Sequence, residues 1–145
     1  MPKLIVTYHP DTYDEFFSDL LADFPTLPQD LMADFLMYKG TGQLPMRFGR
    51  DAPYTQPHAA YRAQLMHIHL KLPPDRFPEN LPQWDRVCRK QAPHKDAALI
   101  YVRGELEEHR YCLFGVLYPD AHARAREEKV MRYLARLAQK FRDEN

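Results

Sequence analysis

The residues best suited to chemistry lie in one stretch, which runs from Tyr38 to Leu70. At its end, Met66, Ile68 and Leu70 alternate with His67, His69 and Lys71. This alternation predicts a strand with both imidazoles and the ammonium on one open face. A glycine-punctuated segment upstream carries Arg47, Arg50, Asp51 and Tyr54. Imidazoles, guanidinium groups, a carboxylate and a phenol are suited to binding and cleaving a phosphodiester, so this stretch is the candidate site.

Cleavage of RNA without a metal needs three kinds of group. A base takes the 2′-OH proton, an acid protonates the departing 5′-oxygen, and cations stabilise the charge on phosphorus. Histidine suits both proton transfers because its ordinary pKa lies near neutral pH, so His67 and His69 are the predicted pair. Arg47 and Arg50 are expected to clamp phosphate oxygens, and Asp51 to orient a histidine or an arginine. RNA contacts are expected at Lys39, Tyr54, Lys71, Tyr101 and His122.

The same residues allow other interpretations. A His-x-His pair on a strand can bind zinc or iron, with His122 or Asp120 completing the ligand set. The sequence has no Cys-x-x-Cys motif and no further histidine or carboxylate at short ligand spacing, so we expect no metal and no other cofactor. A non-catalytic module that binds RNA or protein is a third class, and Arg50 with Asp51 could equally be an ion pair that fixes a loop. Loss of activity with folding retained, after mutation of His67 and His69, would identify an enzyme.

The elements that position these residues are expected in the order βααβββα, an α+β fold with a small, mainly antiparallel sheet. The pattern predicts strands at residues 3–8, 60–72, 97–103 and 110–118, helices at 11–24, 28–39 and 121–142, and a Pro-rich loop at 73–95. The first two helices should form an N-terminal helical hairpin, and the last is a basic C-terminal helix. The two apolar strands after the loop should be central in the sheet. Helices on one face should leave the other face free for substrate.

Length and composition favour one domain over residues 1–145, with the Pro-rich loop inside it. The chain has 145 residues, of which 45% are hydrophobic and 12% aromatic. It contains no apolar run long enough to span a bilayer, and its N-terminus does not resemble a signal peptide, so we expect a cytoplasmic protein without a membrane partner. Cys112 is expected to be buried and Cys88 exposed, without a disulfide between them.

Charge is balanced overall but divided along the chain. Residues 1–37 contain seven acidic residues and one cation, Lys3, which gives −6; because the whole chain sums to +0, residues 38–145 carry +6. This segregation favours one face that repels polyanions and one that attracts them. Ordinary solvated helix faces explain the acidic part equally well.

Several phrases resemble the YafO-type toxins of bacterial type II toxin–antitoxin pairs. They are Tyr38-Lys39, Gly42-x-Leu44-Pro45, Phe48-Gly49-Arg50-Asp51, Tyr54, His67-Ile68-His69-Leu70, Leu99-Ile100-Tyr101 and Leu117-x-Pro119-x-x-His122, in that order. The resemblance extends over residues 31–142. It implies a RelE-like fold and a ribosome-dependent endoribonuclease that cleaves mRNA, inhibits translation and is restrained by a cognate antitoxin. Because acidic segments that fold on binding neutralise basic grooves, we expect the antitoxin to be acidic. The N-terminus and the Pro-rich loop depart from the pattern.

Overall fold

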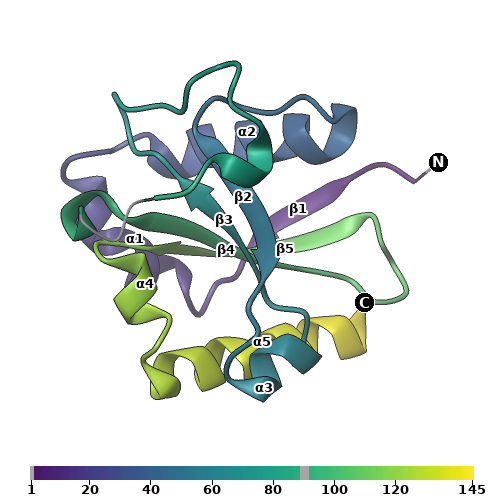
Figure 1. Ribbon diagram of the computed structural model, residues 1–145. Helices are drawn as coiled ribbons and strands as arrows, with labels where there is room; N and C mark the ends of the chain where they lie inside the picture. Colours follow the sequence, from purple (N-terminus) through teal and green to yellow (C-terminus); the bar gives the residue numbers. More distant parts are fainter. Residues whose placement is uncertain (1, 89–91) are drawn as a thin grey trace.

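The structure is a computed structural model that describes residues 2–88 and 92–145 (Figure 1). Its strands are β1 (Ile5–Tyr8), β2 (Phe48–Pro53), β3 (Met66–Leu70), β4 (Ala97–Arg103) and β5 (Arg110–Leu117). Its α-helices are α1 (Tyr13–Leu21), α2 (Leu27–Thr41), α3 (His58–Arg62), α4 (Ala121–Arg124) and α5 (Glu128–Glu144). None of the helices in the described ranges combines the length and apolar character needed to cross a membrane.

The five strands form one sheet in the order β1-β5-β4-β3-β2. Every neighbouring pair is antiparallel except β1 and β5, which are parallel. The expected α+β class with a mainly antiparallel sheet is therefore confirmed. The predicted central position of the two apolar strands is also confirmed, since β4 lies in the middle and β5 lies between β4 and β1. Strands covered on both faces need apolar residues at consecutive positions, and β4 and β5 have them.

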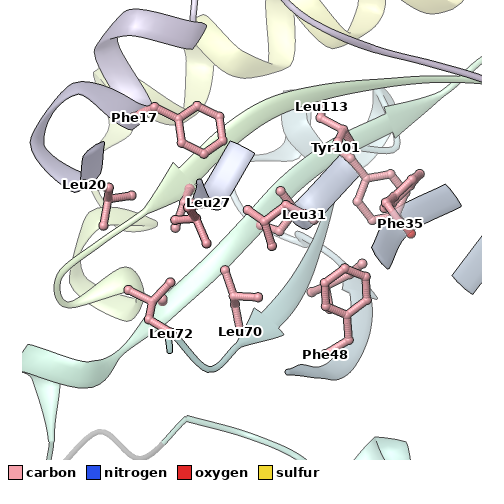
Figure 2. Close-up of a cluster of buried hydrophobic side chains, with 14 of the residues drawn as sticks. Phe17, Leu20, Leu27, Leu31, Phe35, Phe48, Leu70, Leu72, Tyr101 and Leu113 are labelled. Atoms are coloured by element: carbon pink, nitrogen blue, oxygen red, sulfur yellow. The ribbon is translucent and has the colours of Figure 1, made fainter. Parts of the chain in front are cut away.

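Helices cover both faces of the sheet, so the expectation of one free face is wrong. On one face, α1 and α2 enclose a cluster that includes Phe17, Leu31, Phe35, Ile68, Leu70, Leu99 and Tyr101 (Figure 2). On the other face, α3 and α5 enclose Ala60, Leu65, Ile100, Val102, Phe114, Met131, Leu134 and Ala138 (Figure 1). Both sets of alternate residues on β4 and β5 are apolar, so each face gains stability when a helix removes it from water.

The strand expected over residues 60–72 is shorter and is preceded by a helix. Residues His58–Arg62 form α3, and only Met66–Leu70 form β3. Ala60, Ala63 and Leu65 are buried, and they belong to the same core cluster as α5. Alanine favours a helix, so the chain forms a helical turn before the strand. The prediction extended the strand over this turn, although the alternation of apolar and polar residues begins only at Met66.

The expected C-terminal helix consists of two helices. The short α4 begins after Asp120, whose carboxylate accepts a hydrogen bond from the backbone N–H of Ala123 at 3.3 Å. Residues 125–127 separate α4 from α5. With β2, α3 and α4 added, the order is βααβαβββαα rather than βααβββα. The short α4 carries His122, which lies against Asp96 at the start of β4.

The Pro-rich loop is held against β2 by Arg86, a buried arginine with 4% exposure. Its guanidinium donates hydrogen bonds to the backbone carbonyls of Leu81 at 2.8 Å and Glu79 at 3.0 Å, within the loop. It also contacts the carbonyl of Phe48 at 3.4 Å, on β2. Charge-assisted hydrogen bonds offset the cost of burying the cation. Cys88 follows in the same segment and is buried, so its expected exposure is wrong.

Candidate functional site

A small pocket on the face of the sheet that α3 and α5 cover brings three histidines together. It is lined by Tyr54, His67, His69, Asp96, Ala98, Ala121, His122, Ala125 and Arg126, and its volume is about 110 Å³. The ring centroids of His67 and His69 are 5.6 Å apart, and those of His69 and His122 are also 5.6 Å apart. Both β3 histidines line this one pocket, as the alternation predicts. They lie under α4 rather than on an open strand face.

His67 lies against Tyr54 and is partly buried. Its ring stacks on Tyr54 with 4.0 Å between centroids and 10° between planes. Its Nδ1 is buried and has no hydrogen-bond partner among the described residues. Burial, followed by the charge of His69, lowers the pKa of His67 to about 4. The ring is therefore neutral at pH 7, and it forms part of the pocket wall.

His69 is buried, with 8% exposure, and has a defined tautomer. Its Nδ1 accepts the backbone N–H of Cys88 at 3.1 Å, so the proton of the neutral ring resides on Nε2. Burial and then the charge of His122 lower the pKa of His69 to about 4, with Asp96 opposing and Arg50 adding to the shift. In the free protein, His69 is a neutral hydrogen-bond donor at pH 7.

His122 is held by Asp96, a residue that the sequence did not single out. The Asp96 side chain is 1% exposed, and its Oδ2 lies 2.5 Å from His122 Nδ1. The same oxygen accepts the backbone N–H of His122 at 2.8 Å. In the neutral ring, the proton therefore lies on Nδ1 toward the carboxylate, and the lone pair lies on Nε2. The second carboxylate oxygen of Asp96 is buried without a hydrogen-bond partner among the described residues.

Two arginines bring positive charge to this side of the sheet. The Nε of Arg50 donates to the carbonyl oxygen of Trp84 at 2.7 Å, and its guanidinium lies 4.2 Å from the centroid of the Trp84 ring. The charge of Arg50 contributes to the lowered pKa of His69. Arg126, which the sequence did not single out, lines the pocket itself.

Asp51 faces the opposite side of the sheet, toward α2. Its Oδ1 accepts the Tyr101 hydroxyl at 2.7 Å. Its Oδ2 accepts the Tyr38 hydroxyl at 2.7 Å and lies 3.3 Å from Lys39 Nζ. The carboxylate therefore orients two phenols and an ammonium, rather than a histidine or an arginine. Tyr101 is 2% exposed and Tyr54 is 9% exposed, so contact with an RNA base would require RNA to reach buried rings.

The remaining predicted residues lie outside the histidine pocket. Arg47 lines a separate open groove of about 450 Å³ with Asp34 and Arg76, and its Nη1 is buried without a hydrogen-bond partner among the described residues. Lys71 Nζ lies 5.4 Å from the centroid of the Phe77 ring. The structure thus brings His67, His69, His122, Tyr54 and Arg50 to one side of β3. It does not bring Arg47, Asp51, Lys39 or Tyr101 to that pocket, and all their functional roles stay predictions.

A metal site was one alternative interpretation of the histidines. Within residues 2–88 and 92–145, no three or more His, Cys, Asp and Glu side chains are grouped so that they could hold a metal ion. Asp120, one of the two residues considered for completing such a site, caps α4 instead. The other, His122, has Nδ1 committed to Asp96, so only its Nε2 is open toward the pocket.

Comparison with known proteins identifies the family. The profile described as "Toxin YafO, type II toxin-antitoxin system" matches residues 36–143 of this chain. The chain belongs to the YafO toxin family. A relative from Escherichia coli (strain K12), named "mRNA interferase toxin YafO", is 35% identical over 116 residues, which cover 77% of this chain and 83% of the relative. No solved structure matches the chain.

The YafO family match contains the whole histidine pocket. Tyr54, His67, His69, Asp96 and His122 all lie between residues 36 and 143, as do Arg50 and Arg126. The match leaves out β1, α1 and the first part of α2, which form the acidic N-terminal part of this YafO-family toxin.

Proposed function

We propose that this YafO-family toxin is a ribosome-dependent endoribonuclease that cleaves mRNA in the cytoplasm and so inhibits translation. The name of the Escherichia coli relative, an mRNA interferase toxin, supports this activity. The observation that carries the proposal is the pairing of the Asp96-held His122 with His69 across one pocket. A RelE-like arrangement of a single domain, with α1 and α2 as its helical hairpin, is part of the same proposal.

The size of the pocket limits what enters it. Pockets for drug-sized ligands occupy about 300–1,000 Å³. A volume of about 110 Å³ is too small for a nucleotide but has room for a phosphate group and the edge of a ribose. The RNA strand would therefore lie across the mouth of the pocket, with the scissile phosphate between His69 and His122.

In this mechanism, His122 is the base. Its Nδ1–H is donated to Asp96, so Nε2 has a free lone pair to accept the proton of the 2′-OH. As the 2′-oxygen forms its bond to phosphorus, the imidazolium that results is stabilised by the adjacent carboxylate. Asp96 also holds the backbone of His122, so ring position and tautomer are fixed by one residue.

His69 is the proposed acid. Its low pKa in the free protein reflects burial and neighbouring positive charge, and a bound phosphodiester brings negative charge that opposes both effects. Protonation of Nδ1 ends its hydrogen bond with the Cys88 N–H, and the protonated ring then donates its Nε2 proton to the 5′-oxygen as the bond from phosphorus to that oxygen breaks. The products are a 2′,3′-cyclic phosphate and a free 5′-OH. Arg50 and Arg126 stabilise the additional charge on the phosphoryl oxygens, and His67 keeps the ring of His69 in place.

The test is expression without a partner in bacteria, followed by mapping of mRNA ends. The wild-type chain should arrest growth and generate new mRNA ends, whereas His122→Ala and His69→Ala should do neither at equal soluble expression. His109→Ala serves as the matched control, because His109 lies in the turn between β4 and β5, away from the pocket. Normal growth with confirmed soluble wild-type protein would refute the toxin activity.

Two other classes of function give different results in vitro. Cleavage of mRNA on ribosomes should persist when a zinc-selective chelator is added at a magnesium concentration that keeps the ribosomes intact, since the proposed groups need no metal. Loss of cleavage with a zinc-selective chelator and rescue by zinc would indicate a His-x-His metal-dependent hydrolase. RNA or protein binding that is unaffected by His69→Ala and His122→Ala, with no new mRNA ends, would indicate a non-catalytic binding module.

We propose that the antitoxin is a small acidic protein that covers basic residues around Arg47–Arg50 or on α5. The family to which the chain belongs is one of type II toxin–antitoxin systems. Segments that fold on binding cover large charged surfaces well. A co-purified complex in which the interface avoids every basic residue after Lys39 would contradict this proposal.

A further inference from the structure

An open groove between α3 and α5 concentrates positive charge outside the histidine pocket. Its volume is about 660 Å³, and its lining includes Arg62 of α3 together with Arg132, Arg136 and Lys140 of α5. The other lining residues are two alanines, one glutamine and a single carboxylate, Asp143. Four cations and one anion therefore face the same opening, in a chain whose formal net charge is zero.

The two walls of the groove are fixed by the hydrophobic core. Arg132, Arg136 and Lys140 recur every four residues, so they lie along one face of α5 with a rise of about 6 Å from each to the next. Beneath them, Leu134 and Ala138 of α5 belong to the same buried cluster as Ala60 of α3. The helix pair thus holds the cations in a row before any ligand binds, which reduces the entropy cost of binding.

Most of this charge is not neutralised within the protein. Arg132 pairs with Glu128 at 2.6 Å, but both side chains are more than half exposed, so the pair is weak and exchangeable. Asp143 accepts a hydrogen bond from Gln139 at 2.9 Å. Within the described ranges, Arg62, Arg136 and Lys140 form no ion pair with a carboxylate. The groove therefore presents three cations that no carboxylate neutralises and one that is easily released. Of the three, Arg136 lies 5.7 Å from the centroid of the Tyr133 ring, a contact that keeps its positive charge.

We propose that this α3–α5 groove binds the sugar–phosphate backbone of RNA, at a distance from the phosphate that is cleaved. Phosphate contacts need cations at regular spacing and no apolar anchor. A docked protein helix instead needs large apolar anchors, and the only apolar residues of the groove are Ala59 and Ala135. RNA is therefore the partner that the lining favours over an antitoxin helix.

The position of the groove suits an extended RNA. The helices α3, α4 and α5 lie on the same side of the sheet, and α4 carries His122 directly before α5 begins (Figure 1). An RNA strand that leaves the histidine pocket past Arg126 can continue along α5, where it meets Arg132, Arg136 and Lys140 in turn. This inference rests on the proposed function, in which RNA occupies the pocket.

The experiment measures binding of a fluorescent single-stranded RNA with 2′-O-methyl groups, which the toxin cannot cleave. Arg136→Glu and Lys140→Glu should each weaken binding roughly tenfold. Each lost phosphate contact should also reduce the slope of log K against log salt concentration by about 0.7. Lys3→Glu makes the same charge change on the acidic N-terminal part and should alter binding less than twofold. Arg136→Gln checks that loss of the cation, and not only the new carboxylate, weakens binding.

The outcomes separate this inference from the proposed function. Unchanged affinity and salt slope in both groove variants, or an equal loss in Lys3→Glu, would overturn it. Loss of antitoxin binding with RNA binding intact would also overturn it and assign the groove to the antitoxin. A wild-type chain that binds the probe through the groove but causes no growth arrest would refute only the proposed catalysis. Co-sedimentation of the same variants with mRNA-free ribosomes tells which RNA the groove binds. If the groove binds ribosomal RNA, the groove variants should lose ribosome binding. If it binds the mRNA strand, they should keep it.

Discussion

One carboxylate oxygen of Asp96 contacts His122 twice, at 2.8 Å from the backbone nitrogen and at 2.5 Å from ring Nδ1. The first contact fixes where α4 begins relative to β4, and the second fixes which ring nitrogen carries the proton. Because Asp96 is 1% exposed, solvent does not compete for either contact. This pairing is the geometry on which the proposed base depends.

Replacement of Asp96 by asparagine should therefore impair cleavage more than folding. The amide group of Asn can donate to Nδ1 of His122, which would place the ring proton on Nε2 and block proton acceptance. We expect Asp96→Asn to lower the single-turnover rate roughly 10²–10⁴-fold, the range for loss of one proton-transfer group. Asp75→Asn, in an exposed ion pair with Lys95 at 3.5 Å, is the matched control and should cleave normally. A fully active Asp96→Asn variant with an unchanged pH profile would argue against the base assignment.

Arg50 should behave differently from the histidines when the rate is measured against pH. If His122 and His69 act as base and acid, the profile of the wild type is bell-shaped, and His69→Ala removes one limb. In the variant that lacks both histidines, the cleavage rate should fall by far less than the product of the two single-variant losses, because the two groups act as a unit. Arg50→Ala should lower the rate at every pH and leave both limbs present, since a guanidinium does not titrate in this range. Loss of a limb in Arg50→Ala would show that Arg50 controls a titration.

His67 should make the folded protein sensitive to acid. Its folded-state pKa of about 4 lies below the ordinary value of 6.5, so the unfolded chain binds the proton more readily. The contribution of the neutral His67 to the free energy of unfolding is complete above pH 6.5 and decreases as the pH falls toward 4. The total decrease is roughly 3 kcal/mol at most for a shift of this size. His67→Phe keeps a ring against Tyr54 and removes the titration, so urea unfolding of this variant should depend less on pH between 6.5 and 4. Identical pH dependence in both proteins would place the titration elsewhere.

The strands and the histidine face could be predicted from the sequence because each depends on local alternation. Met66 to Leu70 alternate with period two, so both histidines had to share a face. The apolar runs of β4 and β5 likewise required burial on both sides. Applied to the whole sheet, the same reasoning would have predicted two helical layers, since residues such as Ile100 and Leu99 need cover on opposite faces.

The partner of His122 depends on pairing between distant segments. Asp96 and His122 are 26 residues apart in the sequence. The predicted hairpin nevertheless contained a usable signal, because Ala98 pairs with Leu117 and the residue before β4 must then lie near the chain that leaves β5. The direction of Asp51 had no such signal. A register shift between Phe48 and Asp51 alters the alternation of β2, and a bulge of this kind is set by the packing of the loop.

Loss of the Asp51 carboxylate should destabilise the fold. Asp51→Ala would leave two phenol hydroxyls and the Lys39 ammonium, which is 22% exposed, without their shared acceptor. Unpaired buried polar groups cost about 1–3 kcal/mol each, so we expect a loss of roughly 2–5 kcal/mol by chemical denaturation. Asp51→Asn retains an acceptor and should lose less, and Asp19→Ala on the exposed face of α1 should be near neutral. Unchanged stability together with a hundredfold slower cleavage would instead support the catalytic role first predicted for Asp51.

The Pro-rich loop lies so close to β2 that no side chain should fit at Gly49. A Cβ there would lie 2.2 Å from the backbone oxygen of Arg86, the same oxygen that accepts the N–H of Arg50 at 2.8 Å. The obstacle is backbone held by a buried arginine, so Gly49→Ala must displace the loop or bend β2. We expect a loss of roughly 1–3 kcal/mol, the usual cost of overpacking. The displaced loop should also be cut faster by protease.

Gly40→Ala is the matched control for this substitution. Gly40 lies within α2, and a Cβ at that position would meet Leu4 Cδ2 at an ordinary 3.8 Å. Alanine is preferred over glycine in a helix interior, so this variant should gain roughly 0.5–1 kcal/mol. Because the loop also supplies the Cys88 N–H to His69 and the Trp84 carbonyl to Arg50, Gly49→Ala should slow cleavage as well. Equal stability, protease resistance and cleavage in the two variants would mean that the loop is not held against β2 in solution.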